Sequence, residues 1–123
     1  MKRKILIVED NVGLSQIQKD WLSRAGYDAV TAMSEPIARS LIRRMQFDLI
    51  LSDVRLPEGD GISLLEWLRK EKKDIPFIIT TEYVSVPDVV RTIKLGARDY
   101  LPKPVHRDYL LELAEDVFHP VAP

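Results

Sequence analysis

The segment Leu49-Ile50-Leu51-Ser52-Asp53-Val54-Arg55-Leu56-Pro57 is the strongest indication of the fold, because it contains a short apolar run that ends in a carboxylate. An equivalent run, Lys4-Ile5-Leu6-Ile7-Val8, is followed by Glu9-Asp10. Continuously apolar runs of this length are typical of parallel strands buried on both faces. The carboxyl ends of parallel strands meet at one edge of an open α/β sheet, where ligands bind. The two runs therefore predict three acidic side chains at one functional edge.

Short apolar runs alternate with longer amphipathic stretches, a pattern typical of a parallel α/β sheet. We predict strands near residues 4–8, 28–32, 49–52, 77–80 and 98–101, and helices near 12–25, 35–45, 62–70, 85–96 and 107–118. The second and fifth runs are the least apolar, so they are expected at the edges of the sheet. The helical spacing predicts the following inward-facing residues: Leu14, Ile17, Trp21 and Ala25; Ile37, Leu41 and Met45; Leu65 and Leu68; Val89, Val90 and Ile93; Leu110, Leu113, Ala114 and Val117.

The composition is that of one ordinary globular domain and excludes several classes of function. The 123 residues carry 18 Lys and Arg against 19 Asp and Glu, so there is no basic field to bind nucleic acid by counterion release. The absence of cysteine excludes disulfides and thiolate metal sites. No apolar stretch approaches the length of a membrane span, so the cytoplasm is the simplest location. We expect one domain over residues 1–118 and the start of a linker or tail over 119–123.

Two more polar side chains are expected at the acidic edge. Thr81 follows the apolar run 77–80, and Lys103 follows the run that ends at residue 102. Side chains alternate along a strand, so Thr80 and Thr81 cannot both face the site. Three neighbouring carboxylates repel one another and need a counter-charge. A hard divalent cation fits, because such ions prefer oxygen ligands.

These motifs resemble the response-regulator receiver domain, the phosphoacceptor module of two-component signalling. The matching segments, in order, are Val8-Glu9-Asp10, Asp53-Val54-Arg55-Leu56-Pro57-Glu58-Gly59-Asp60-Gly61, Thr81 and Gly96-Ala97-Arg98-Asp99-Tyr100-Leu101-Pro102-Lys103-Pro104. The resemblance covers essentially the whole chain. It implies a flavodoxin-like, doubly wound α/β fold, with a five-stranded parallel sheet in the order 2-1-3-4-5 and five flanking helices.

The resemblance also implies a role for each residue at the acidic edge. Asp53 is implied to be the phosphoacceptor, a signalling role rather than that of an enzyme. Mg²⁺ is the implied cofactor, held by Asp10, by Asp53, by the backbone carbonyl of Arg55 and, largely through water, by Glu9. Lys103 is implied to pair with Asp53 and then with a phosphoryl oxygen. The peptide bond between Lys103 and Pro104 is implied to be cis, which would direct the lysine inward.

A second group of positions is implied to switch or modulate the site. In receivers the hydroxyl that matches Thr81 moves to the phosphoryl group, and the aromatic residue that matches Tyr100 follows it inward. The positions of Arg55 and Tyr83 modulate hydrolysis of the acyl phosphate. Glu82 departs from the pattern, since receivers usually carry a small residue there. We expect Glu82 to restrict small phosphodonors.

The implied partners are a sensor histidine kinase and an output domain outside this chain. The sequence of residues 99–104 is reminiscent of receivers attached to DNA-binding transcription regulators. No direct binding of nucleic acid and no membrane contact are expected. A homodimer through the fourth helix, fifth strand and fifth helix is a further expectation. The charges that complement one another on this surface are Arg91, Lys94 and Arg98 against Glu112, Glu115 and Asp116.

Alternative functions fit the sequence less well. A phosphatase of the haloacid dehalogenase type carries a second Asp two residues after its nucleophile, where this chain has Arg55. A nucleotide-binding module needs a Gly-rich loop after the first strand, where this chain has Glu9-Asp10-Asn11. A receiver that acts as a protein-interaction module without phosphorylation stays open, and Glu82 is the feature that favours it.

Overall fold

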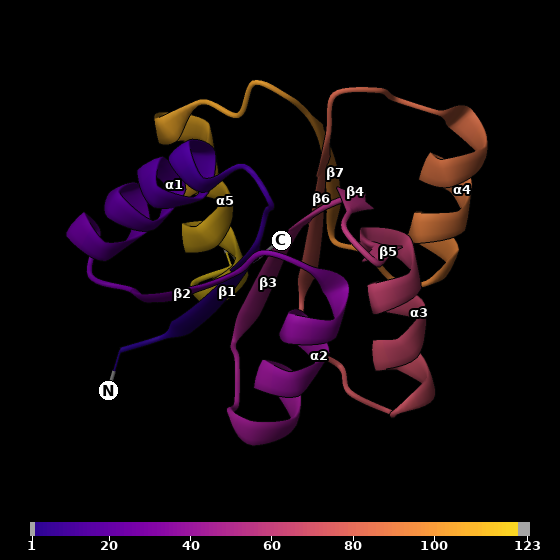
Figure 1. The fold of residues 1–123 in the computed structure, drawn as a ribbon. Helices are drawn as coiled ribbons and strands as arrows, with labels where there is room; N and C mark the ends of the chain where they lie inside the picture. Colours follow the sequence, from indigo (N-terminus) through magenta and orange to yellow (C-terminus); the bar gives the residue numbers. More distant parts are fainter. Residues whose placement is uncertain (1, 121–123) are drawn as a thin grey trace.

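The computed structural model describes residues 2–120, so part of the expected tail, residues 121–123, lies outside the described residues. Strands and helices alternate along the chain (Figure 1). The strands are β1 (Lys4–Val8), β2 (Asp28–Ala32), β3 (Leu49–Asp53), β4 (Arg55–Leu56), β5 (Gly59–Asp60), β6 (Phe77–Thr81) and β7 (Asp99–Pro102). The helices are α1 (Val12–Arg24), α2 (Glu35–Arg44), α3 (Gly61–Lys70), α4 (Val86–Lys94) and α5 (Arg107–Phe118).

Within residues 2–120, five parallel strands form one sheet in the order β2-β1-β3-β6-β7. This is the predicted order, with β2 and β7 at the edges, and the flavodoxin-like fold is confirmed. The order reverses between β1 and β3, which makes the carboxyl ends of these two strands the expected place for a ligand. β4 and β5 form a short antiparallel hairpin directly after β3, and the sequence did not predict it.

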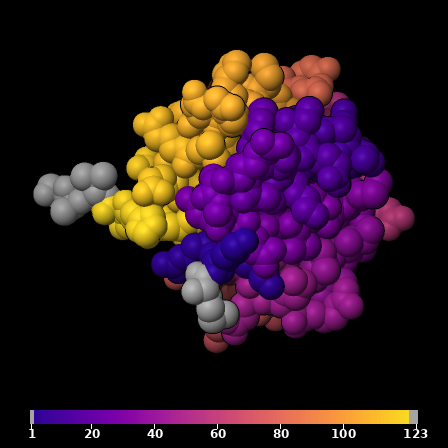
Figure 2. Space-filling model, turned by 90° about the vertical axis from the view of Figure 1, so that its left-hand side faces the viewer, coloured from indigo at the N-terminus to yellow at the C-terminus, as the bar shows by residue number. Residues whose placement is uncertain are grey.

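The sheet is covered on both faces (Figure 1). α2, α3 and α4 lie on one face, while α1 and α5 lie side by side on the other, which Figure 2 views directly. Alternate residues of the central strands point into two apolar cores, one on each side. Leu65 and Leu68 fill the core beneath α3, and Leu22 and Leu110 fill the opposite core.

Side chains define where most of the helices begin. The N-caps that accept a backbone N–H through their side chains are Asn11, Ser34, Asp60 and Ser85. Gly26 follows the end of α1 with φ +98°, a conformation that glycine adopts without steric cost. Among residues 2–120, none of the helices combines the length and the apolar character that crossing a membrane requires.

The inward faces predicted for three helices are partly wrong. Ile17 on α1, Ile37 on α2 and Ile93 on α4 were expected inside but are 49%, 48% and 63% exposed. Each of these helices turns a different stripe to the sheet, which includes Gln18 on α1 and Thr92 on α4. Small and polar residues let these helices pack closely on the sheet, so apolar spacing alone misplaced their faces. The faces predicted for α3 and α5 are confirmed, as Leu65, Leu68, Leu110 and Ala114 are buried.

The difference between the two kinds of helix face predicts a difference in stability. Leu68 is 0% exposed, so Leu68→Ala should lower the free energy of unfolding by about 2–5 kcal/mol through lost burial and a cavity. Ile93→Ala removes exposed atoms and should cost less than about 0.5 kcal/mol. Urea unfolding of both variants measures the two effects. Similar losses for both would show that α4 buries Ile93 in solution.

Candidate functional site

Three carboxylates converge at the point where the strand order reverses. Glu9 and Asp10 follow β1, and Asp53 is the last residue of β3, which pairs directly with β1. One ligand oxygen of each carboxylate lies within 4.8 Å of those of the other two. Glu9 and Asp53 are buried, while Asp10 is exposed. The sequence therefore placed all three acids at one edge, as the structure has them.

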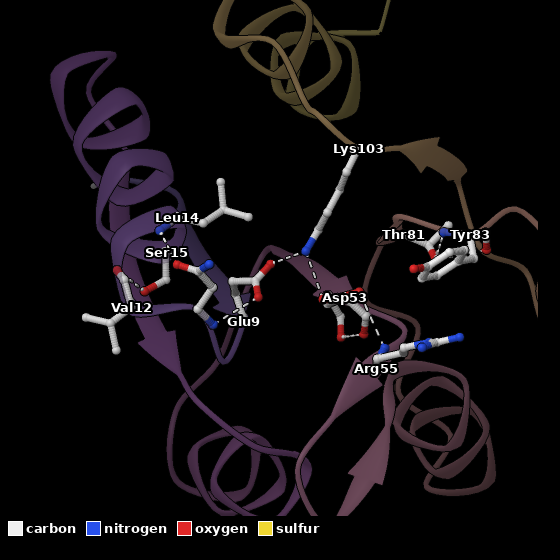
Figure 3. Close-up of polar contacts among 11 residues, drawn as sticks. Glu9, Val12, Leu14, Ser15, Asp53, Arg55, Thr81, Tyr83 and Lys103 are labelled. Carbon is white, nitrogen blue, oxygen red and sulfur yellow. Dashed lines mark hydrogen bonds and ion pairs between the residues drawn. The ribbon is translucent and has the colours of Figure 1, made fainter.

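A lysine bridges the two buried carboxylates (Figure 3). Lys103 Nζ donates to Glu9 Oε1 at 2.6 Å and to Asp53 Oδ2 at 2.8 Å. The lysine follows β7, and its backbone N–H donates to the carbonyl of Thr81 at 2.7 Å. The bond between Lys103 and Pro104 is cis, as the sequence implied. The ammonium thus reaches the acidic cluster from the loop that follows the outer strand β7.

Burial and ion pairing shift the pKa values of this pair. Burial raises the pKa of Glu9, and the hydrogen bonds from Lys103 and from the Asn11 amide lower it only in part. Burial acts to lower the pKa of Lys103, but the hydrogen bonds to Asp53 and Glu9 outweigh it, so the pKa is raised. When all are ionised, three carboxylates against one ammonium leave an excess of two negative charges in the cluster. A divalent cation with oxygen ligands matches this excess.

The backbone after Asp53 is held closely against the site. The Arg55 amide points towards Asp53 Oδ1, with 3.4 Å between the nitrogen and the oxygen. Gly61 donates its N–H to the carbonyl of Val54 at 2.8 Å. A Cβ at Gly61 would lie 2.2 Å from the carbonyl oxygen of Asp53, so only glycine fits there. The chain between Asp53 and Gly61 therefore folds back closely against the backbone of Asp53.

A small cleft of about 220 Å³ opens beside Asp53. Its lining residues are Asp10, Asp53, Arg55, Thr81, Glu82 and Tyr83. Thr81, rather than Thr80, lines this cleft, in agreement with the sequence-based choice. Glu82 is exposed at the rim of the cleft, next to two other acids.

Thr81 and Tyr83 are linked by local hydrogen bonds (Figure 3). The hydroxyl of Thr81 donates to the carbonyl of Tyr83 at 3.0 Å and accepts from its N–H at 3.1 Å. The Arg55 guanidinium stacks on the Tyr83 ring, 4.5 Å from the ring centroid. This stacking joins two residues that line the cleft, and no pattern in the sequence predicts it.

Tyr100 lies in β7 with its hydroxyl fully buried and without a hydrogen-bond partner among residues 2–120. Burial raises the pKa of this phenol, and the charge of Asp88 adds to the shift. The Thr81 hydroxyl and the Ser85 backbone lie near enough to lower the pKa in part, although neither meets hydrogen-bond geometry. A buried donor without an acceptor is costly, which favours a rearrangement that supplies one.

The hairpin after β3 is also held from outside the predicted site. Glu35, the first residue of α2, is buried, and its Oε1 accepts from the Asp60 N–H at 2.9 Å. Its other oxygen pairs with Arg39. Glu35 was not predicted as a functional residue, because an acid in the first turn of a helix is expected simply to interact favourably with the helix dipole.

The family model of the response regulator receiver domain matches residues 5–115. The chain belongs to this family. The transcriptional regulatory protein GlrR of Escherichia coli K12 is 34% identical over 97% of this chain and 27% of its own length. The transcriptional regulatory protein ZraR of Salmonella typhimurium is 40% identical over 93% of this chain and 26% of its own length. The receiver domain thus spans about a quarter of these relatives.

Solved receiver structures share the fold. The CheY-like receiver domain protein from Methanospirillum hungatei has a TM-score of 0.91 and 31% identity, and the alignment covers 96% of this chain and 95% of that one. The non-phosphorylated HemR receiver domain from Leptospira biflexa has a TM-score of 0.89 and 36% identity, with 99% and 98% covered. The resemblance inferred from the sequence motifs is confirmed.

The shared ammonium predicts a pH-dependent loss of stability. Lys103→Met should cost of the order of 3 kcal/mol of unfolding free energy at neutral pH, because two buried carboxylates lose their partner. Without the lysine the pKa of Glu9 rises further, so the folded state binds more protons than the unfolded state. Stability should therefore recover as the pH falls towards about 5.

Urea unfolding at neutral pH and at about pH 5 measures this effect. Lys94→Met, which removes an exposed lysine on α4, is the matched control and should change little at either pH. An equal loss in Lys103→Met at both pH values would show that the lysine acts through packing rather than charge.

Proposed function

We propose that this receiver domain accepts a phosphoryl group on Asp53 from the phosphohistidine of a sensor histidine kinase, with Mg²⁺ as cofactor. The observation that carries the proposal is the Lys103 ammonium at 2.8 Å from Asp53 Oδ2, beside carboxylates that exceed it in charge. Phosphoryl transfer depends mainly on positioning and on neutralising the transferring oxygens, and this arrangement supplies both.

In the transfer, a carboxylate oxygen of Asp53 attacks phosphorus while the bond from phosphorus to the histidine nitrogen breaks, which leaves an acyl phosphate. Lys103 exchanges part of its pairing with Asp53 for a phosphoryl oxygen. Asp10, Asp53, the backbone carbonyl of Arg55 and, through water, Glu9 would hold Mg²⁺, which supplies positive charge to the phosphoryl oxygens. The close fit of the three carboxylates supports this ligand set.

The response to phosphorylation begins at Thr81. Its hydroxyl leaves the carbonyl of Tyr83 and donates to a phosphoryl oxygen, and Tyr100 moves with it and gains an acceptor for its buried hydroxyl. Arg55, stacked on Tyr83, lines the cleft and modulates hydrolysis of the acyl phosphate. The switch is a local charge change that biases a two-state element.

The surface of α4, β7 and α5 transmits the change to a second copy or an output domain. Exposed apolar side chains on α4, namely Val86, Val90 and Ile93, support a contact role for this surface. Arg91, one of the charges expected at a dimer interface, pairs with Glu66 of α3 at 2.6 Å and would have to exchange this partner. The relatives named as transcriptional regulatory proteins support a transcriptional output.

Labelling with a small phosphodonor tests the proposal. Intact-protein mass after incubation with acetyl phosphate should show one phosphoryl adduct per chain, which requires both Mg²⁺ and Asp53. Asp53→Asn, which preserves size, and excess chelator should each abolish the adduct. An adduct that persists in Asp53→Asn would contradict the assigned phosphoacceptor.

Glu82 should slow labelling by small anionic donors, because its carboxylate lies at the rim of the cleft. A repulsion of about 1 kcal/mol between exposed charges corresponds to about fivefold in rate, so Glu82→Ala should speed labelling by this order. Glu115→Ala, an exposed acid on α5, is the control. The measurement is the rate at which the phosphoryl adduct forms. Equal rates in Glu82→Ala and the wild type would rule out this role for Glu82.

A further inference from the structure

The anchor of the β4–β5 hairpin is a buried carboxylate outside the acidic cluster. Glu35 is 4% exposed, and each of its carboxylate oxygens has a partner within the protein. Oε1 accepts from the Asp60 N–H at 2.9 Å, and Oε2 pairs with Arg39 one helical turn away. In the part of the chain that the structure describes, Glu35 does not belong to the group of carboxylates close enough together to share a metal ion. Its buried charge therefore serves the hairpin rather than a ligand.

The backbone of the hairpin is shaped around this carboxylate. Gly59 has φ +155°, and a Cβ there would lie 2.1 Å from Glu35 Oε1. No side chain larger than glycine's fits between the hairpin and α2 without displacing Glu35. Asp60 in turn caps α3, where its side chain accepts from the Ser63 N–H at 2.6 Å. The carboxylate thus fixes the strand β5 at the point where α3 begins.

Strand β5 fixes the position of Arg55. Asp60 pairs with Arg55 across the two-stranded hairpin, and Gly59 pairs with Leu56. Arg55 follows Asp53 by two residues, and its carbonyl is the one backbone ligand in the proposed Mg²⁺ site. A continuous chain of contacts therefore runs from Glu35 through Asp60 to the backbone of Arg55.

We infer that Glu35 is a positioning residue for the metal site: by holding the Asp60 N–H, it fixes the hairpin that presents the Arg55 carbonyl to Mg²⁺. This inference rests on the proposed function, since it concerns the same Mg²⁺ site. Removal of a group that orients a metal ligand without touching the metal typically lowers metal affinity by roughly 10–100-fold. Glu35 is a group of this kind, provided by a helix that contributes no ligand.

The test is an Mg²⁺ titration of the full chain, followed by the NMR shift of the Arg55 amide. Glu35→Ala should raise the Kd for Mg²⁺ about tenfold, although no ligand is removed. Glu35→Gln retains an oxygen that accepts from the Asp60 N–H and should stay within about threefold of the wild type. Glu58→Ala, which removes an exposed acid from the same hairpin, controls for the loss of one negative charge.

A second readout does not involve the metal. In metal-free protein the Asp60 amide should exchange with solvent faster in Glu35→Ala than in Glu35→Gln, because its acceptor has gone. Amides of the central strands report in the same spectra that the variant is folded. Equal Mg²⁺ affinity in Glu35→Ala and Glu58→Ala would overturn the inference, as would an equal loss in Glu35→Ala and Glu35→Gln.

The same titration separates this inference from the proposed function. Asp53→Asn should weaken Mg²⁺ binding in every background if the site is as proposed. A wild-type affinity that does not depend on Asp53 would overturn the metal site, and the role of Glu35 with it. Binding that depends on Asp53 but not on Glu35 would overturn the role of Glu35 alone.

Discussion

The interaction on which the site depends is the ammonium of Lys103 shared between Glu9 and Asp53. It joins positions that are 94 and 50 residues apart in the sequence, so it exists only when the sheet is assembled. One ammonium cannot neutralise three carboxylates, so the cluster keeps an excess of negative charge that a divalent cation would offset. In the proposed function, the residues that stabilise this part of the fold are therefore also the ones that bind the ligands.

The topology of the sheet brings these side chains together. Because the strand order reverses between β1 and β3, the acids that end these strands lie side by side with no helix between them. The lysine comes from the loop after the outer strand β7, at the same carboxyl end of the sheet. The sheet does not position the segment between Asp53 and α3. This segment forms the β4–β5 hairpin, which is held by Glu35 and is followed by a close contact between Gly61 and Asp53.

The residues whose positions follow from the ends of strands could be located from the sequence. Asp53, Asp10 and Thr81 were placed correctly because a parallel sheet brings its carboxyl ends together, whatever the packing of its helices. The faces of α1, α2 and α4 were partly misplaced, since exposed residues such as Ile17 and Ile93 share the spacing of a buried stripe. Glu35 escaped notice because its partner, a backbone N–H in an unpredicted hairpin, has no signature in the side-chain pattern.

In the proposed function, the excess negative charge at this end of the sheet binds a divalent cation. A ligand that binds only the folded state stabilises it, by about 1.4 kcal/mol at ten times its Kd. The decisive measurement is thermal unfolding with and without Mg²⁺ at matched ionic strength, on the wild type and on Asp10→Asn, which leaves the buried Lys103 pairs intact. Mg²⁺ should raise the unfolding temperature of the wild type and have little effect on that of Asp10→Asn. An equal response of the two proteins, or none in the wild type, would contradict this proposal.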